Sequence, residues 1–162
     1  MAKKKSINLN SKKYFEQGKK HLRNRDYVKA KDAFEKVVDL DSNYPKAYSY
    51  LIPVYHALNM DANAVQAFKN AIEIDKEDLA AHYNLAMMSL KKQQYLTAKK
   101  LFKKVIDANK RHVGAIFGFG IASYRTGNMA AAKKCFEFVS MADPKNGIAK
   151  KYLEHISKQR LK

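Results

Sequence analysis

Histidine, cysteine and carboxylate side chains are the first candidates for catalysis or metal binding. The sequence has one cysteine, Cys135, and five histidines, which are His21, His56, His82, His112 and His155. The histidines lie far apart and lack paired acids at the spacing of metal ligands. Cys135 precedes Phe136 in an apolar helical pattern, which favours a small core residue over a nucleophile. We expect no catalytic centre, no metal site and no cofactor.

The segment GFGIASYRTG, residues 118–127, is rich in glycine but lacks the lysine and hydroxyl pattern of a phosphate-binding loop. Its glycines are better explained by close helix packing and by a turn. The sequence therefore argues against an enzyme.

Basic residues point to binding instead. The chain of 162 residues has 32 lysines and arginines against 15 acidic residues, a net charge of +17. Such a field favours acidic partners, whether nucleic acid, an anionic membrane surface or an acidic protein segment. Residues 79–112 are the most basic stretch, with eight basic residues and one acid, whereas residues 45–78 have three basic and five acidic residues.

The elements that position these side chains repeat with a period of 34 residues. One column holds phenylalanine four times, at Phe34, Phe68, Phe102 and Phe136, and another holds alanine, at Ala30, Ala64, Ala98 and Ala132. A third column, Gly18, Ile52, Ala86 and Gly120, is mostly small. Small residues let two helices approach closely, and phenylalanines one turn away fill the space between neighbouring helix pairs. One unit cannot bury its apolar face alone, so the units must stack.

This pattern closely resembles the tetratricopeptide repeat family, over residues 11–44, 45–78, 79–112 and 113–146. The turn sequences NRDY, NMDA, KQQY and TGNM and the repeat end ADPKNG carry the resemblance further. It implies an all-α fold, a right-handed superhelical solenoid of antiparallel helix pairs that acts as a non-catalytic protein-interaction scaffold.

The ends of the chain differ from the repeats. Residues 147–162 continue the apolar phase with a lysine-rich opposite face, which predicts a capping helix. Residues 1–10 are expected to form a flexible basic tail. They lack the apolar stretch of a signal peptide, and no apolar run is long enough for a membrane span, so we expect a cytoplasmic protein.

In this family the first helix of each pair lines the concave surface, so the resemblance implies which side chains face a ligand groove. We expect apolar and aromatic contacts together with cations for anionic groups. The predicted groove residues are Phe15, Lys19, Arg23, Ser49, Pro53, Tyr83, Met87, Lys91, Phe117, Ile121, Tyr124 and Arg125. They suit an acidic, apolar peptide or an acidic amphipathic segment of another protein. The alternative is that several of these aromatics only pack between adjacent helices.

Pro53 lies well inside the expected first helix of the second repeat. Because proline has no N–H, the carbonyl of Ser49 loses its helical donor. We expect a kinked but continuous helix whose free Ser49 carbonyl is open to water or a ligand.

Two other binding modes remain open. The first is binding of nucleic acid or an anionic surface through a basic patch on the convex side, formed by Lys92, Lys99, Lys100, Lys103 and Lys104. These lysines are equally consistent with an ordinary solvated helix face, and they lack interleaved aromatics for base stacking. The second is self-assembly into a homo-oligomer through the ends or groove of the array.

Overall fold

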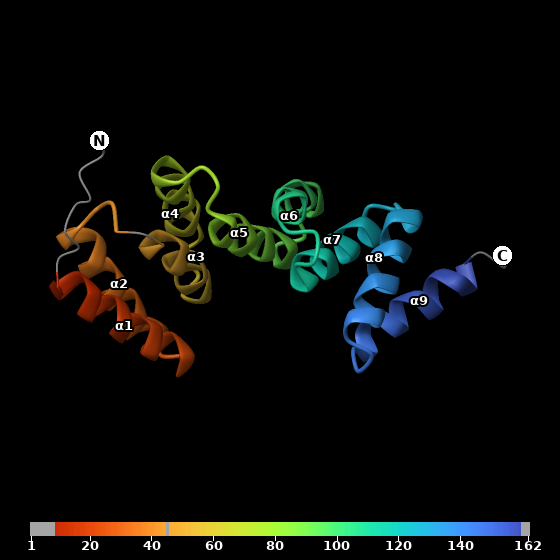
Figure 1. Ribbon diagram of the computed structural model, residues 1–162, viewed down its shortest axis with the longest axis horizontal. Helices are drawn as coiled ribbons and strands as arrows, with labels where there is room; N and C mark the ends of the chain where they lie inside the picture. Colours follow the sequence, from red (N-terminus) through yellow and green to blue (C-terminus); the bar gives the residue numbers. More distant parts are fainter. Residues whose placement is uncertain (1–8, 45, 160–162) are drawn as a thin grey trace. The chain divides into compact units, whose positions relative to one another are not determined.

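The computed structural model describes residues 9–44 and 46–159, and this part of the chain is helical, without a β-strand. Its helices are α1 (Leu9–Arg23), α2 (Tyr27–Leu40), α3 (Ala47–Ala57), α4 (Asp61–Ile74), α5 (Leu79–Lys91), α6 (Tyr95–Ala108), α7 (Val113–Arg125), α8 (Met129–Ala142) and α9 (Gly147–Gln159) (Figure 1). They pack in consecutive pairs, which confirms the expected all-α class.

The first helix begins earlier than predicted. Leu9 and Asn10, which were expected in the basic tail, form the first turn of α1. Both are exposed, and neither is a helix breaker. The remainder of the expected tail, residues 1–8, and the last three residues of the expected cap range lie outside the described residues.

The chain divides into two compact units, Met1–Leu85 and Ala86–Lys162, with the boundary inside α5. In the first unit α1 packs on α2, α2 on α3, and α3 on α4. In the second unit α6 packs on α7, α7 on α8, and α8 on α9. Each unit has its own buried core.

The turns that join the helices of each pair share one backbone feature. A residue with a left-handed backbone occurs at Arg25, Asn59, Gln93 and Gly127, with φ between 58° and 78°, once in every 34 residues. Only Gly127 is a glycine, the residue that adopts this conformation without steric cost. The backbone therefore follows the sequence period even where the residue type does not.

In the first unit the repeated phenylalanine is Phe34, which is fully buried. Its ring lies so close to Gly18 of α1 that a Cβ there would sit 2.7 Å from a ring carbon. On its other side Phe34 contacts Tyr50 of α3, with ring centroids 5.3 Å apart. The phenylalanine thus joins one helix pair to the next.

In the second unit two of the repeated phenylalanines also pack closely against a neighbouring helix. Phe102 of α6 packs against Gly118 of α7, where a Cβ would come within 2.3 Å of the ring. Phe136 of α8 stacks on Tyr152 of α9 with ring centroids 4.6 Å apart and planes 9° from parallel. Both phenylalanines are completely buried.

Gly118→Ala is expected to destabilise the second unit by about 1 kcal/mol or more. Overpacking costs about 1–3 kcal/mol, which outweighs the roughly 1 kcal/mol that alanine gains over glycine inside a helix. Gly147→Ala is the matched control, because a Cβ at Gly147 would meet no atom within 4 Å. Urea unfolding followed by circular dichroism compares the two. Equal stability of both variants would show that the Phe102 contact is not tight.

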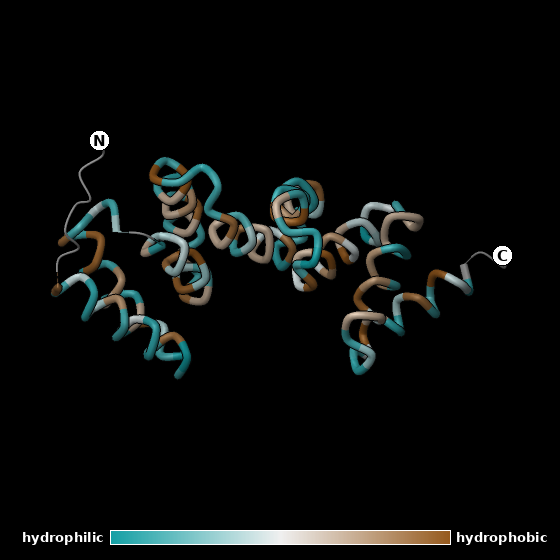
Figure 2. Tube along the Cα trace, viewed as in Figure 1, coloured by the Kyte–Doolittle hydropathy of each residue, from teal (hydrophilic) through white to brown (hydrophobic). Residues whose placement is uncertain are grey.

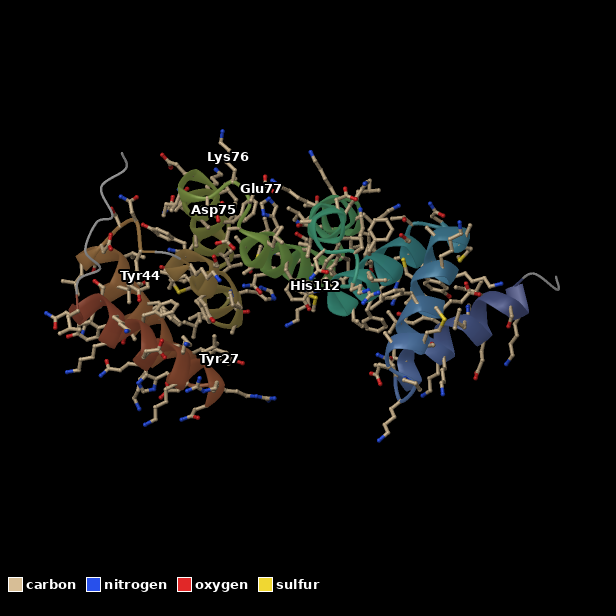
Figure 3. All side chains as sticks on the ribbon, in the orientation of Figure 1. Tyr27, Tyr44, Asp75, Lys76, Glu77 and His112 are labelled. Carbon is tan, nitrogen blue, oxygen red and sulfur yellow. The ribbon has the colours of Figure 1, made fainter. Side chains whose placement is uncertain are left out.

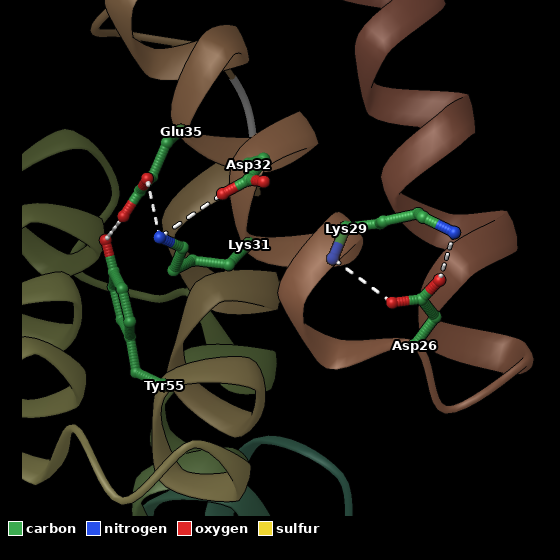
Figure 4. Close-up of polar contacts among 6 residues, drawn as sticks. All are labelled: Asp26, Lys29, Lys31, Asp32, Glu35 and Tyr55. Atoms are coloured by element: carbon green, nitrogen blue, oxygen red, sulfur yellow. Dashed lines mark hydrogen bonds and ion pairs between the residues drawn. The ribbon is translucent and has the colours of Figure 1, made fainter.

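Polar contacts join α3 to α2 and cap α2 in the first unit (Figure 4). The hydroxyl of Tyr55 on α3 donates to Glu35 Oε1 on α2 over 2.9 Å. Burial, followed by this carboxylate, raises the pKa of Tyr55 well above its usual value. Asp26 caps α2 by accepting from the backbone N–H of Lys29, and the Lys29 side chain lowers the pKa of Asp26.

Hydropathy alternates around most helices, as the apolar and polar stretches of the α6 and α8 traces show (Figure 2). None of the helices in the described residues combines the length and the apolar character needed to cross a bilayer.

Candidate peptide-binding faces and their supports

The histidines take separate local roles. His82 is buried, and its Nδ1 lies 2.8 Å from the carbonyl oxygen of Asp78, to which Nδ1–H donates. His112 caps α7 by accepting from the backbone N–H of Ala115. Within the described ranges, no three histidine, cysteine or acidic side chains lie close enough together to hold a metal ion.

Pro53 lies inside the continuous helix α3, as expected. The prediction that the Ser49 carbonyl is free was wrong. The side-chain amide of Asn84, on α5, donates to this oxygen from Nδ2 over 2.9 Å. Asn84 supplies the donor that proline lacks, because a buried backbone carbonyl left unpaired costs free energy.

Ser49 itself was predicted to face the ligand groove, and that prediction was also wrong. Its side chain is 1% exposed, and its hydroxyl donates to Asp78 Oδ2. Asp78 is also buried, and its Oδ1 accepts from the backbone N–H of Ala81, which caps the start of α5. Ser49 is buried because it supports this cap, so it cannot contact a peptide.

The same region contains a cavity of about 270 Å³ in the first unit. Tyr44 and Asp75, both labelled in Figure 3, line it together with Lys46, Tyr48 and Ile74. Its lining mixes apolar surface with one ammonium and the carboxylates of Asp75 and Asp78.

The predicted groove residues of α1 are largely occupied by internal contacts. Phe15 contacts the rings of Phe34, Tyr44 and Tyr50, with centroids 5.0–5.7 Å apart. The ammonium of Lys19 pairs with Glu16 at 3.0 Å, so this cation is partly neutralised. Arg23, at the end of α1, is exposed.

Two further predicted residues of the first unit are partly accessible. Pro53 is half-buried. Tyr83 of α5 is also half-buried, and burial raises its pKa above the usual value.

In the second unit α7 carries the most complete set of predicted side chains. Phe117, Ile121 and Tyr124 are half-buried, and all three pack against the core formed by Ile116, Phe136 and their neighbours. Phe117 meets Phe136 edge-to-face, with centroids 6.0 Å apart. Arg125, at the end of α7, is exposed and has no hydrogen bond or ion pair with the described residues.

Helix α9 extends this face. The hydroxyl of Tyr124 is hydrogen-bonded to Nδ1 of His155 at 2.6 Å. The rings of Tyr124 and Tyr152 meet edge-to-face with centroids 5.0 Å apart. Tyr124, Tyr152 and His155 thus form an aromatic cluster, here called the α7–α9 cluster, and Arg125 follows Tyr124 in the sequence.

The part of α5 in the second unit provides Met87 and Lys91 at positions equivalent to Ile121 and Arg125, 34 residues earlier. Met87 is half-buried and Lys91 is exposed. Apolar and cationic side chains therefore recur at the same two positions of consecutive first helices.

Two lysines of the predicted basic patch, Lys99 and Lys103, make contacts within the second unit. Lys103 bonds to Asp107 at 2.7 Å, and this pairing, together with Lys110, lowers the pKa of Asp107. Lys99 lies over the ring of Phe119 and within 3.4 Å of the Thr126 hydroxyl. Lys92 and Lys100 are exposed and Lys104 is half-buried.

Comparison with known proteins agrees with this architecture. Residues 79–112 match the sequence model of the tetratricopeptide repeat family. No curated protein sequence matches the chain. Solved structures match it closely in fold: MamA from Desulfovibrio magneticus RS-1 has a TM-score of 0.84 at 17% identity, over 96% of this chain and 88% of that one.

Pseudomonas aeruginosa PilF has a TM-score of 0.83 at 16% identity, over 93% of this chain and 69% of that one. A further crystal structure of MamA gives 0.78 at 18% identity, over 93% and 82%. The helices of the described residues fit four repeats and a capping helix. Residues 79–112 match the tetratricopeptide repeat model, and the chain has the fold of these solved repeat proteins.

Proposed function

We propose that the protein is a non-catalytic scaffold that binds an acidic, apolar segment of another protein through the exposed faces of its first helices. The observation that carries the proposal is the α7 face of the second unit. There the half-buried Phe117, Ile121 and Tyr124 lie on one helix with Arg125, a cation without an internal partner.

Each part of this face has a counterpart in an acidic, apolar segment. Aromatic and arginine side chains dominate binding hot spots, because they combine large apolar area with specific hydrogen bonding. Arg125 can bind a carboxylate through two parallel hydrogen bonds. The α7–α9 cluster keeps Tyr124 in place before a ligand arrives, which lowers the ordering cost of binding.

The first unit offers fewer side chains that are available for binding a peptide. Displacing Glu16 from Lys19 is cheap, since exposed ion pairs contribute about 0–1 kcal/mol. Phe15, however, is half-buried and contacts three aromatic rings of its own unit. We place the principal anchors in residues 86–162.

The test uses a fluorescein-labelled synthetic peptide, here called the glutamate–leucine peptide, in which leucine and phenylalanine alternate with pairs of glutamates. We expect binding in the micromolar range. Tyr124→Ala and Arg125→Glu should each weaken it about tenfold, the equivalent of about 1.4 kcal/mol. Fluorescence anisotropy measures the affinity.

Lys145→Glu is the matched control for Arg125→Glu. It makes the same change of charge at an exposed position between α8 and α9. If the two charge reversals weaken binding equally, the effect is one of net charge, and the α7 face is not the site.

A labelled oligonucleotide of the same length distinguishes the nucleic-acid alternative. Phosphate contacts release counterions, so such binding falls steeply with salt. Retention of peptide binding and loss of oligonucleotide binding at raised salt would support the scaffold, and the reverse would contradict it.

A further inference from the structure

An apolar cleft lies in the second unit, where side chains of α6, α7 and α8 line it and none of the α7–α9 cluster does. Its volume is about 350 Å³. Helix α7 contributes Ile116 and Phe119, α6 contributes Ile106, and α8 contributes Cys135 and Phe138. Pockets of this size and mostly apolar lining are typical of ligand sites.

The polar border of the cleft is predominantly cationic. Lys103 and Lys134 line it together with one carboxylate, that of Asp107. Asp107 bonds to both Lys103 and Lys110, so it is already neutralised. Lys134 is exposed and has no partner among the residues that the structure describes. Residues 86–162 as a whole have 17 basic and 4 acidic residues, net +13, so an anionic ligand is favoured here.

The equivalent positions two repeats earlier show that the fold does not require this chemistry. Lys103, Lys134 and Phe138 correspond there to Glu35, Gln66 and Asn70. Glu35 is bonded to the hydroxyl of Tyr55, as Figure 4 shows. Gln66 donates to Asn70 over 2.9 Å. The first unit satisfies these positions internally, whereas the second presents apolar and cationic groups.

The charge of the chain argues against its own ends as occupants. Residues 1–8 contain three lysines and no acid, and residues 160–162 contain two basic residues and no acid. A flat bilayer surface is not complementary to this cleft either, because the apolar side chains that line a recess cannot insert into a membrane. The complementary shape is a protruding apolar side chain next to carboxylates.

We infer that this cleft is a second docking site, which binds an acidic peptide segment by one or two large apolar side chains inserted between α6 and α8. Phe119 and Phe138 contact the inserted side chain, while Lys103 and Lys134 bind flanking carboxylates. With the α7 face on the first-helix side, the chain then holds two acidic segments at once.

Cys135 gives a specific readout, because it lines the cleft and is the one cysteine in the chain. The 162-residue protein is labelled with N-ethylmaleimide at fixed pH, with and without the glutamate–leucine peptide lacking fluorescein, and the product is measured by mass spectrometry. Burial raises the pKa of this thiol, so labelling is slow enough to follow. We expect saturating peptide to slow labelling about tenfold.

Variants taken from the equivalent positions test the contacts. Lys103→Glu with Lys134→Gln should raise the peptide concentration needed for half-maximal protection about tenfold, and Phe138→Asn should do the same. Lys133→Gln is the control, because Lys133 pairs with Glu137 and does not line the cleft. The charge variants keep the proposal testable if Phe138→Asn fails to fold.

The outcomes separate this inference from the proposed function. Protection that persists in Tyr124→Ala but needs about tenfold more peptide in the Lys103→Glu, Lys134→Gln variant supports a separate cleft site. Unchanged labelling with peptide, or protection by decanoate but not by peptide, overturns it. Protection that depends on protein concentration without peptide would mean that a second copy occupies the cleft, which also overturns it.

Discussion

Phe136→Ala is expected to destabilise the second unit by about 3–5 kcal/mol, the usual cost of truncating a buried phenylalanine. The ring is completely buried and contacts two neighbouring helices, through Gly120 and Phe117 on α7 and Tyr152 on α9. The cavity therefore opens where the capping helix joins the last pair. The loss is measured by urea unfolding with circular dichroism.

Phe136→Leu is the matched control. It keeps an apolar side chain of similar volume, so its cost should stay below about 1.5 kcal/mol. Because Tyr152 stacks on Phe136 and also touches Tyr124, the alanine variant should weaken peptide binding at the α7 face as well. A loss smaller than that of the leucine variant would contradict the assignment of Phe136 as the centre of this core.

Asn84→Ala is expected to cost about 1–3 kcal/mol, because it leaves the Ser49 carbonyl without a donor. The same change in a Pro53→Ala background should cost much less. Alanine at position 53 restores the backbone N–H that donates to the carbonyl one turn earlier. Pro53→Ala alone should stabilise the first unit, since an interior proline costs about 3 kcal/mol in an unsupported helix.

The double-mutant cycle gives the coupling energy directly, and contacting residues typically couple by about 0.5–3 kcal/mol. Asn63→Ala, an exposed position in α4, is a control that should show no coupling to Pro53. If the effects of Pro53→Ala and Asn84→Ala simply add, then Asn84 does not replace the missing donor.

Much of the fold could be predicted because its signals are local and repeated. The phenylalanine at Phe34, Phe68, Phe102 and Phe136 and the alanine four residues before each predict helix pairs of one kind. Residue type does not limit the turns, since Arg25 and Gln93 adopt the left-handed backbone that Gly127 adopts freely. The period therefore predicted the architecture better than any single motif.

The details of the site were harder to predict, because they depend on contacts between helices. The helical phase predicts that Ser49 lies next to Pro53 on a ligand-binding face. In the structure Ser49 is buried instead, because its hydroxyl donates to the buried carboxylate of Asp78. Asn84 is 31 residues from Pro53, and no local pattern links the two. The pairing of Lys19 with Glu16, by contrast, follows from their spacing of three residues and was detectable in the sequence.

The cleft in the second unit left a weak sequence signal. In the column that contains Asn70 and Phe138, a polar residue is replaced by an aromatic one. A single large apolar residue on an expected solvent face is common. Phe138 becomes informative only by comparison with the polar Asn70 at the same position of an earlier repeat. Without the positions of Ile106 and Phe119 this difference does not indicate a recess.

The most direct test of the scaffold function is a titration of the 15N-labelled protein with the glutamate–leucine peptide, followed by amide chemical shifts. The proposal predicts shift changes centred on Ile121, Tyr124 and Arg125 that saturate in the micromolar range. Arg125→Glu should require about tenfold more peptide for saturation, and Lys145→Glu should not. Saturating shifts that leave α7 unchanged, or no shifts at all, would contradict the claim that the first-helix face of the second unit binds acidic, apolar segments.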